Sequence, residues 1–199
     1  MDTSGSFPYH SEIFTAMSGG EPELVDLAAL IPDAVLDLRY ATRDNFLGEV
    51  VYGAAAARLR RPAAEKLVGV AAALRARGLR LVIYDAYRPL SAQRRMWALK
   101  PDRRYVADPA RGSQHNRGAA VDAALADESG RALPMPSAFD EFGPRAAHSY
   151  AGGDPAAREN RRTLREAMEA GGFLALEEEW WHYADPGGRA WPLLDVTPP

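Results

Sequence analysis

Two short segments of the chain hold the side chains best suited to chemistry. Residues 113–122, SQHNRGAAVD, contain His115 and Asp122, and residues 177–185, EEEWWHYAD, contain His182. Two histidines and one carboxylate form a ligand set that suits catalytic zinc, which keeps one coordination position open for water. The sequence therefore predicts a site for one zinc ion held by His115, Asp122 and His182.

Two further side chains supply the remaining parts of a peptide-hydrolysing site. Glu179 precedes His182 by three residues, and it can take a proton from a metal-activated water and pass it to a leaving amine. Arg88 lies in the segment YDAYRP, residues 84–89, and it can stabilise the oxyanion that forms on an attacked carbonyl. The combination favours a metallopeptidase with Glu179 and Arg88 as its catalytic residues.

Each of these segments, taken alone, also has a purely structural interpretation. Asp122 could pair with Arg117, which would compensate a buried carboxylate without any metal. His182 could be a hydrogen-bonded histidine of an aromatic core, and Arg88 could form a salt bridge with Asp85. Only the presence of all three segments in one chain favours the metal site over these alternatives.

The composition narrows the classes of function. The chain has 199 residues, which suits one domain, and it has no cysteine, so disulfides, zinc ribbons and thiol nucleophiles are excluded. Its four histidines, at positions 10, 115, 148 and 182, limit the possible metal sites. The net charge of −3 argues against nucleic-acid binding. The sequence contains no run of 18 apolar residues, so it predicts no membrane span.

The first twenty residues differ in composition from the rest of the chain. Residues 1–20 are rich in Ser and Gly and lack the basic and apolar regions of a secretory signal, so they are predicted to form a flexible leader of a cytoplasmic protein. Residues 21–199 are predicted to form a single domain. The sequence does not predict an oligomeric state.

Hydrophobic patterning predicts the elements that must position the chemical groups. Helices and strands alternate without the regular order of βαβ units, which indicates an α+β fold with a central, mostly antiparallel sheet flanked by helices. Ser91 is predicted to cap the second helix. The predicted strands are residues 34–39, 79–85, 119–125, 173–178 and 180–183, and the predicted helices are residues 62–77, 91–99 and 157–170.

The spacing of the candidate groups restricts where they can lie. Seven positions separate His115 from Asp122, and on one straight strand they would face opposite ways, so His115 is expected on the loop that enters the strand. Gly118 allows the chain to bend between them. Glu179 and His182 would also face opposite ways on a regular strand, so a bulge or a turn is required if both serve one site.

The motifs resemble those of the D-alanyl-D-alanine dipeptidases of the VanX-like type. The pattern S-x-H-x-x-G-x-A-x-D is present at residues 113–122, E-W-W-H at 179–182 and Y-R-P at 87–89. Two further segments, DLRYATRDNFLG at residues 37–48 and SAFDEF at residues 137–142, also match. The resemblance runs in order from about Glu21 to Asp195.

The resemblance implies a Hedgehog/D,D-peptidase-like fold, one zinc ion and hydrolysis of D-Ala-D-Ala, a peptidoglycan building block, to D-alanine. It also implies that Ser113 contacts the dipeptide near the metal. Tyr40 and Asp140 would receive the free amino group of the substrate, although a buried tyrosine and a helix-capping aspartate would look the same in the sequence. His148 lies near a histidine of the family but receives no role.

One departure from the resistance-type relatives affects the expected substrate. The segment between Pro89 and Ser113 is shorter here, which predicts a more open pocket. A D,D-carboxypeptidase or cell-wall peptidase that acts on longer peptides is therefore one alternative. A zinc-binding module without catalysis is another, and it would need neither Glu179 nor Arg88.

Overall fold

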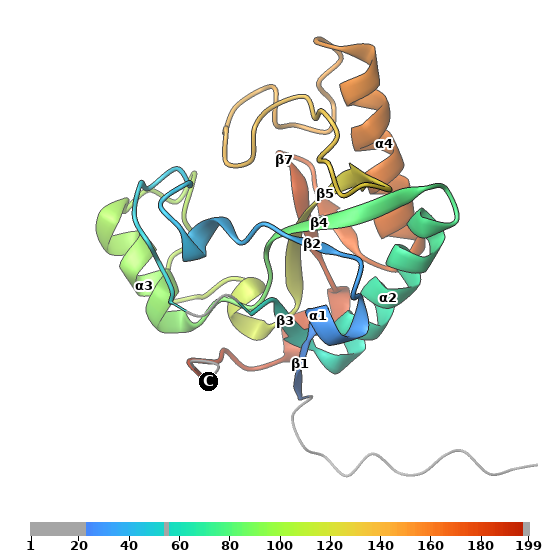
Figure 1. Ribbon diagram of the computed structural model, residues 1–199. Coiled ribbons are helices and arrows are strands. Elements are labelled where there is room, and N and C mark those ends of the chain that lie inside the picture. The colour runs from blue at the N-terminus through green and yellow to red at the C-terminus, as the bar shows by residue number, and fades with distance from the viewer. Residues whose placement is uncertain (1–22, 54–55, 197–199) are drawn as a thin grey trace, which may run out of the picture.

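A five-stranded sheet forms the centre of the computed structural model, which describes residues 23–53 and 56–196 (Figure 1). The predicted leader, residues 1–20, lies outside the described residues. The strand order is β2-β4-β5-β7-β6; β2 is parallel to β4, and the other neighbours are antiparallel, which confirms the predicted sheet. The strands are β2 (Val35–Leu36), β4 (Leu79–Asp85), β5 (Ala120–Asp127), β6 (Leu174–Leu176) and β7 (Glu179–Ala184).

Two long helices pack together on one side of this sheet (Figure 1). They are α2 (Arg61–Arg75), with Pro62 in its first turn, and α4 (Pro155–Ala170), capped by the side chain of Asp154. Their apolar faces, including Leu67 and Leu164, belong to the main hydrophobic core. Burying these stripes against the sheet provides most of the stability of such helices. Both helices were predicted.

The remaining elements are short. Strands β1 (Leu24–Asp26) and β3 (Arg58–Arg60) form a separate antiparallel pair, and helix α1 (Leu27–Leu30) follows β1. Three 3₁₀ turns, η1 (Arg39–Ala41), η2 (His115–Arg117) and η3 (Pro186–Ala190), complete the described structure. The strand predicted over residues 34–39 is too long. Strand β2 lies at the edge of the sheet and covers only Val35–Leu36, and η1 begins at Arg39.

Helix α3 (Leu90–Leu99) lies away from α2 and α4 and contributes to a second hydrophobic cluster (Figure 1). The predicted cap at Ser91 is wrong. Pro89 occupies the N-cap position, and the backbone N–H of Ser91 instead donates to Oδ1 of Asp195 at 2.7 Å. A carboxylate distant in the sequence thus satisfies an amide that the helix itself leaves free.

No helix within residues 23–53 and 56–196 is long and apolar enough to cross a membrane.

Candidate metal centre and active site

Strand register brings two of the predicted metal ligands together. Asp122 on β5 is directly opposite His182 on β7 and, on its other side, opposite Asp85 on β4. Residues directly opposite on neighbouring strands point to the same face of a sheet. The side chains of Asp85, Asp122 and His182 therefore form one row across β4, β5 and β7. Asp122 is the polar member of an otherwise apolar stretch, with AAV before it and AAL after it.

His115 reaches this row from the turn that precedes β5, as the spacing predicted. It begins the 3₁₀ turn η2, which ends at Gly118 with φ of +64°. A Cβ atom at Gly118 would lie 2.8 Å from Cδ2 of Leu24 and 3.2 Å from the backbone nitrogen of Arg60. Backbone conformation and lack of space both require glycine here. This bend aims His115 back towards Asp122.

The three candidate ligand atoms converge on one point. Nε2 of His115 lies 3.2 Å from Nδ1 of His182 and 3.3 Å from Oδ1 of Asp122, which is itself 3.0 Å from Nδ1 of His182. Ligands about 2.0–2.1 Å from a tetrahedral zinc ion would be separated by roughly 3.3 Å. The spacing of this donor set therefore fits zinc. Among the described residues it is the group of three that could hold a metal ion.

The hydrogen bonds around these ligands prepare them to bind a cation. Nδ1 of His115 lies 2.7 Å from the carbonyl oxygen of Ala86, to which a neutral ring donates its N–H, so Nε2 is the nitrogen available as a ligand. Burial disfavours the charged form of Asp122, but the two imidazoles outweigh it and keep the pKa of this carboxyl well below its usual range. Arg117 donates to the carbonyl groups of Trp191 and Arg111, so the alternative pairing of Asp122 with Arg117 is wrong.

Glu179 lies beside the ligands because the pairing of β6 with β7 is irregular. Ala175 pairs with Tyr183, but the next residue, Leu176, pairs with Glu179, so β7 accommodates extra residues between these pairs. This is the bulge that the spacing of Glu179 and His182 required, and both side chains line one cavity. Burial raises the pKa of Glu179 above its usual range.

Arg88 is buried and held on three sides. Its Nε atom donates to Oδ2 of Asp85 at 2.9 Å, an Nη2 hydrogen goes to the same oxygen, and Nη1 donates to Oε1 of Gln93 at 2.9 Å. The guanidinium also stacks on the ring of Tyr40 at 4.8 Å. The salt bridge between Arg88 and Asp85, expected from the structural alternative, is therefore present. It does not exclude the catalytic role, because two of the five N–H groups of the guanidinium have no partner in these hydrogen bonds.

Tyr40 and Asp140 form a second polar pair at the same cavity. The Tyr40 hydroxyl donates to the carboxylate of Asp140, at 3.0 and 2.9 Å from its two oxygens. Burial and the nearby charge of Asp122 raise the pKa of Asp140 well above its usual range. Asp140 has φ of +60° and caps no helix of the described chain, so the helix-capping alternative is wrong.

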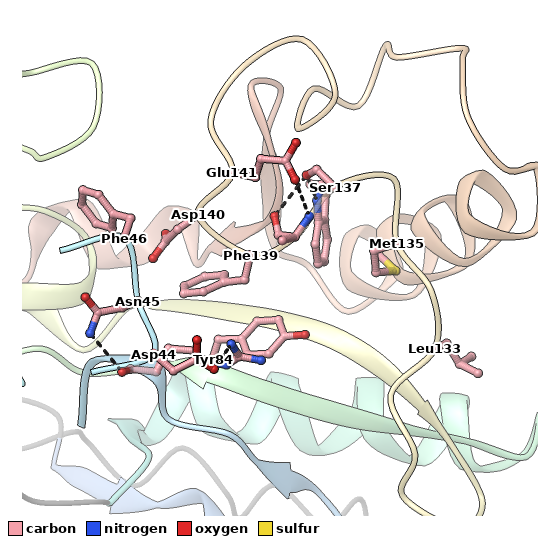
Figure 2. Close-up of a pocket in the computed structure, with 13 residues that line it drawn as sticks. Asp44, Asn45, Phe46, Tyr84, Leu133, Met135, Ser137, Phe139, Asp140 and Glu141 are labelled. Atoms are coloured by element: carbon pink, nitrogen blue, oxygen red, sulfur yellow. Dashed lines mark hydrogen bonds and ion pairs between the residues drawn. The ribbon is translucent and has the colours of Figure 1, made fainter. Parts of the chain in front are cut away.

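One cavity of about 240 Å³ connects these groups. His115, which is 3% exposed, is buried and does not line the cavity, while the other predicted site residues do. A larger cavity of about 440 Å³, shown in Figure 2, also has Asp140 in its wall. The predicted residues on the wall of the smaller cavity are Tyr40, Arg88, Ser113, Asp122, Asp140, Glu179 and His182.

A family model described as D-ala-D-ala dipeptidase, of the Peptidase_M15 family, matches residues 20–195. The chain belongs to this family. The D-alanyl-D-alanine dipeptidase of Escherichia coli K12 is 42% identical over 86% of this chain and 89% of that protein. The enzyme of the same name from Enterococcus faecium is 33% identical over 74% of this chain and 83% of that protein. A structure of a mutant vancomycin-resistance D,D-pentapeptidase VanY with Zn(II) has a TM-score of 0.41 and 20% identity over 67% of this chain and 76% of that chain.

Two buried residues of this D-Ala-D-Ala dipeptidase family member support the site but were missed in the sequence. Asn116 accepts from the backbone and hydroxyl of Ser113 through Oδ1, at 2.7 and 3.1 Å, and donates to the carbonyl of Arg88 at 2.9 Å. Gln93 connects Arg88 to the carbonyl of Ala107, to which it donates at 2.8 Å. Asn116 lies inside the motif of residues 113–122, which was the available signal. Gln93 has no comparable signal.

Proposed function

We propose that this protein is a zinc-dependent dipeptidase that hydrolyses D-Ala-D-Ala to two molecules of D-alanine. The observation that carries the proposal is the convergence of three ligand atoms, from His115, Asp122 and His182, on a cavity that Glu179 and Arg88 also line. Membership of the D-Ala-D-Ala dipeptidase family and the names of the relatives support the substrate.

The three ligands would hold one zinc ion through Nε2 of His115, Nδ1 of His182 and a carboxylate oxygen of Asp122. When bound, zinc supplies a Lewis acid that polarises a carbonyl and lowers the pKa of water towards neutrality. The partners of His115, Ala86 and Asp85, keep its ring in the orientation this requires.

Glu179 acts as the general base and then as the general acid. Its carboxylate takes a proton from the attacking water and delivers it to the peptide nitrogen, so the carbon–nitrogen bond breaks and the second D-alanine leaves as an amine. The raised pKa of Glu179, caused by burial, brings the group closer to the value at which it can perform both transfers.

Arg88 stabilises the negative charge that develops on the carbonyl oxygen. Asp85 and Gln93 hold its guanidinium in place before the substrate arrives, so little reorganisation is needed as the charge forms. The charge of Asp85 is shared with the hydroxyl of Tyr52, which donates to Oδ1 at 2.8 Å, so Arg88 is not fully neutralised by this partner.

Polar groups that line the cavity, together with its volume, determine which peptides fit. Asp140 and Tyr40 supply a carboxylate and a hydroxyl for the free ammonium group of a dipeptide. Ser113, held by Asn116, lies near the metal ligands and contacts the peptide. The volume of about 240 Å³ is below the range of roughly 300–1,000 Å³ typical of drug-sized ligands, which favours a small substrate.

The test is the release of D-alanine by purified protein, with and without a chelator. D-Ala-D-Ala, L-Ala-D-Ala and a longer peptide ending in D-Ala-D-Ala are compared. Chelator-sensitive hydrolysis of D-Ala-D-Ala alone is expected. Preferred cleavage of the longer peptide would replace the proposal with a D,D-carboxypeptidase, and zinc binding without hydrolysis would replace it with a binding module.

A cytoplasmic location and the single domain over residues 21–199 remain predictions from the sequence.

A further inference from the structure

A third cavity lies along α4 and is lined by none of the proposed catalytic groups. Its volume is about 500 Å³, and it shares no lining residue with the cavity that holds Glu179 and Arg88. Four arginines and one histidine line it, with a single carboxylate, and we call it the basic cavity. Its charged and titratable residues are His148, Arg158, Glu159, Arg161, Arg162 and Arg165.

Two of the four arginines are neutralised by ion pairs within the chain. Arg162 pairs with Glu159 at 2.6 Å and with Glu166 at 2.9 Å. Arg165 pairs with Glu169 at 2.8 Å and with Glu177 at 2.6 Å. The single carboxylate of the basic cavity is therefore already used by Arg162.

The other two arginines have no carboxylate partner in the described part of the chain. Arg158 donates through Nη1 to the carbonyls of Gly152 and Gly153, at 3.2 and 2.8 Å. Arg161 is buried and donates to the carbonyls of Ala147 and Tyr150, at 2.9 and 2.8 Å. Burial and the nearby positive charge of Arg158 lower the pKa of Arg161, so the cavity concentrates positive charge that the described residues leave uncompensated.

His148 supplies the independent observation that points to a ligand. Its side chain is 8% exposed and lines the basic cavity, yet neither ring nitrogen has a hydrogen-bond partner among the described residues. An unsatisfied buried polar group costs free energy, and native structures contain few of them. A ligand that accepts a hydrogen bond from the ring N–H would satisfy one of the two nitrogens and reduce this cost.

We propose that the basic cavity binds the phosphoryl group of an anionic ligand. Arg158 and Arg161 are three positions apart on α4, so they lie on the same face of the helix. Each retains N–H groups beyond those given to the backbone, and a neutral His148 adds one more donor. A phosphoryl group has enough acceptor oxygens for all three side chains, and its charge of about −1.5 to −2 matches two arginines better than a carboxylate does.

The first experiment measures binding of inorganic phosphate to the zinc-loaded protein by isothermal titration calorimetry, at constant ionic strength. Acetate is the carboxylate comparison, and glucose 6-phosphate distinguishes free phosphate from a phosphoryl group on a larger molecule. Phosphate or the sugar phosphate should bind more tightly than acetate. Equal binding of acetate, or no binding of either phosphate compound, would overturn the proposal.

Matched variants separate this cavity from the metal, which is also a possible phosphate ligand. Arg158→Gln should weaken phosphate binding about tenfold or more, because it removes a charged hydrogen bond. Arg165→Gln is the control: its side chain lines the same cavity but is already paired with Glu169 and Glu177, which do not line it, so affinity should change little. Equal phosphate affinity in the wild type and Arg158→Gln would assign binding to another site and refute the proposal.

The His148 ring provides a direct readout if either variant folds poorly. Its NMR signals should shift on addition of phosphate in the wild-type protein and remain unchanged on addition of chloride. Absence of a shift at saturating phosphate would contradict the proposal. Hydrolysis of D-Ala-D-Ala by Arg158→Gln should equal that of the wild type, so failure of the phosphate site and failure of the proposed function are distinguishable.

Discussion

The metal centre and the basic cavity both bury histidines beside charged groups, but they differ in how the chain satisfies them. In the metal centre, His115 contacts Ala86, Asp122 and His182, and Arg88 is held by Asp85 and Gln93. In the basic cavity, both ring nitrogens of His148 lack a hydrogen-bond partner among the described residues, and Arg161 donates there to neutral carbonyl groups.

This difference separates two ways in which a protein prepares a binding site. A network whose members hold one another has its geometry fixed before the substrate arrives, which is what catalysis requires. A buried group left without a partner instead raises the free energy of the empty state, and a ligand that pairs with it gains that amount on binding. The metal centre thus has the fixed geometry that catalysis needs, and the basic cavity has the unpaired groups that favour ligand binding.

The largest expected effect is on turnover, at Glu179. Replacing Glu179 with Ala should lower kcat by about 10²–10⁴-fold, the usual contribution of a general base, while the zinc content stays the same. Glu178→Ala is the matched control, because Glu178 does not line the catalytic cavity. Near-normal activity in Glu179→Ala with full zinc content would remove Glu179 from the mechanism and weaken the contrast between the two regions.

Arg88→Lys should reduce kcat about 10²–10³-fold with a smaller change in KM, as expected for loss of an oxyanion donor. Lysine keeps the charge but cannot reproduce the planar set of donors that contacts Asp85 and Gln93. The control is Arg94→Lys, since Arg94 is exposed and only pairs with Asp195 at 3.6 Å. A rise in KM alone would indicate that Arg88 binds the substrate in its ground state.

Asp140→Asn tests the role of Asp140 through the pH dependence of KM. The pKa of Asp140 is raised by burial and by Asp122, so it takes up its proton at a higher pH than an ordinary aspartate. The KM for D-Ala-D-Ala should therefore rise as the pH falls through that raised pKa, because the protonated carboxyl no longer attracts the ammonium group. Asp140→Asn should have a KM about tenfold higher at neutral pH and should lose this part of the pH dependence. An unchanged KM would exclude Asp140 from substrate binding.

The smallest expected effect is on stability, at His148. Burial and the nearby charge of Arg165 lower the pKa of His148 from 6.5 to about 4, so between these pH values the unfolded chain binds the proton and the folded chain does not. Acidification should therefore reduce stability over this interval, and His148→Phe should flatten that slope.

The same variant tests the unsatisfied ring at neutral pH. Without phosphate, the Tm of His148→Phe should be unchanged or a few degrees higher, because no hydrogen bond is lost. In metal-free protein, His115→Phe should lower the Tm, because it removes the hydrogen bond to Ala86. A clear loss of stability in His148→Phe would show that the imidazole has a partner and would remove the contrast on which the phosphate site rests.

Much of the fold could be predicted because the main strands and helices have regular patterns of apolar residues. Strands β4 and β5 are apolar runs, and helices α2 and α4 have one apolar stripe each, so their positions are close to those predicted. The edge strand β2 and the cap of α3 were predicted less well. Pairing at a sheet edge and a capping carboxylate from Asp195 depend on segments far away in the chain.

The amino-acid sequence was sufficient to predict which chemical groups are available: no cysteine and three candidate metal ligands. It also predicted a bend at Gly118 and a bulge or turn near Glu179. These follow from residue type and local spacing, which are properties of short segments. The packed structure adds that Gln93 and Asn116 support the site and that Arg117 does not pair with Asp122. It also places His148 in one cavity with Arg158 and Arg161, without a hydrogen-bond partner among the described residues. Hydrogen-bond partners and burial arise when distant segments pack together, and no local pattern encodes them.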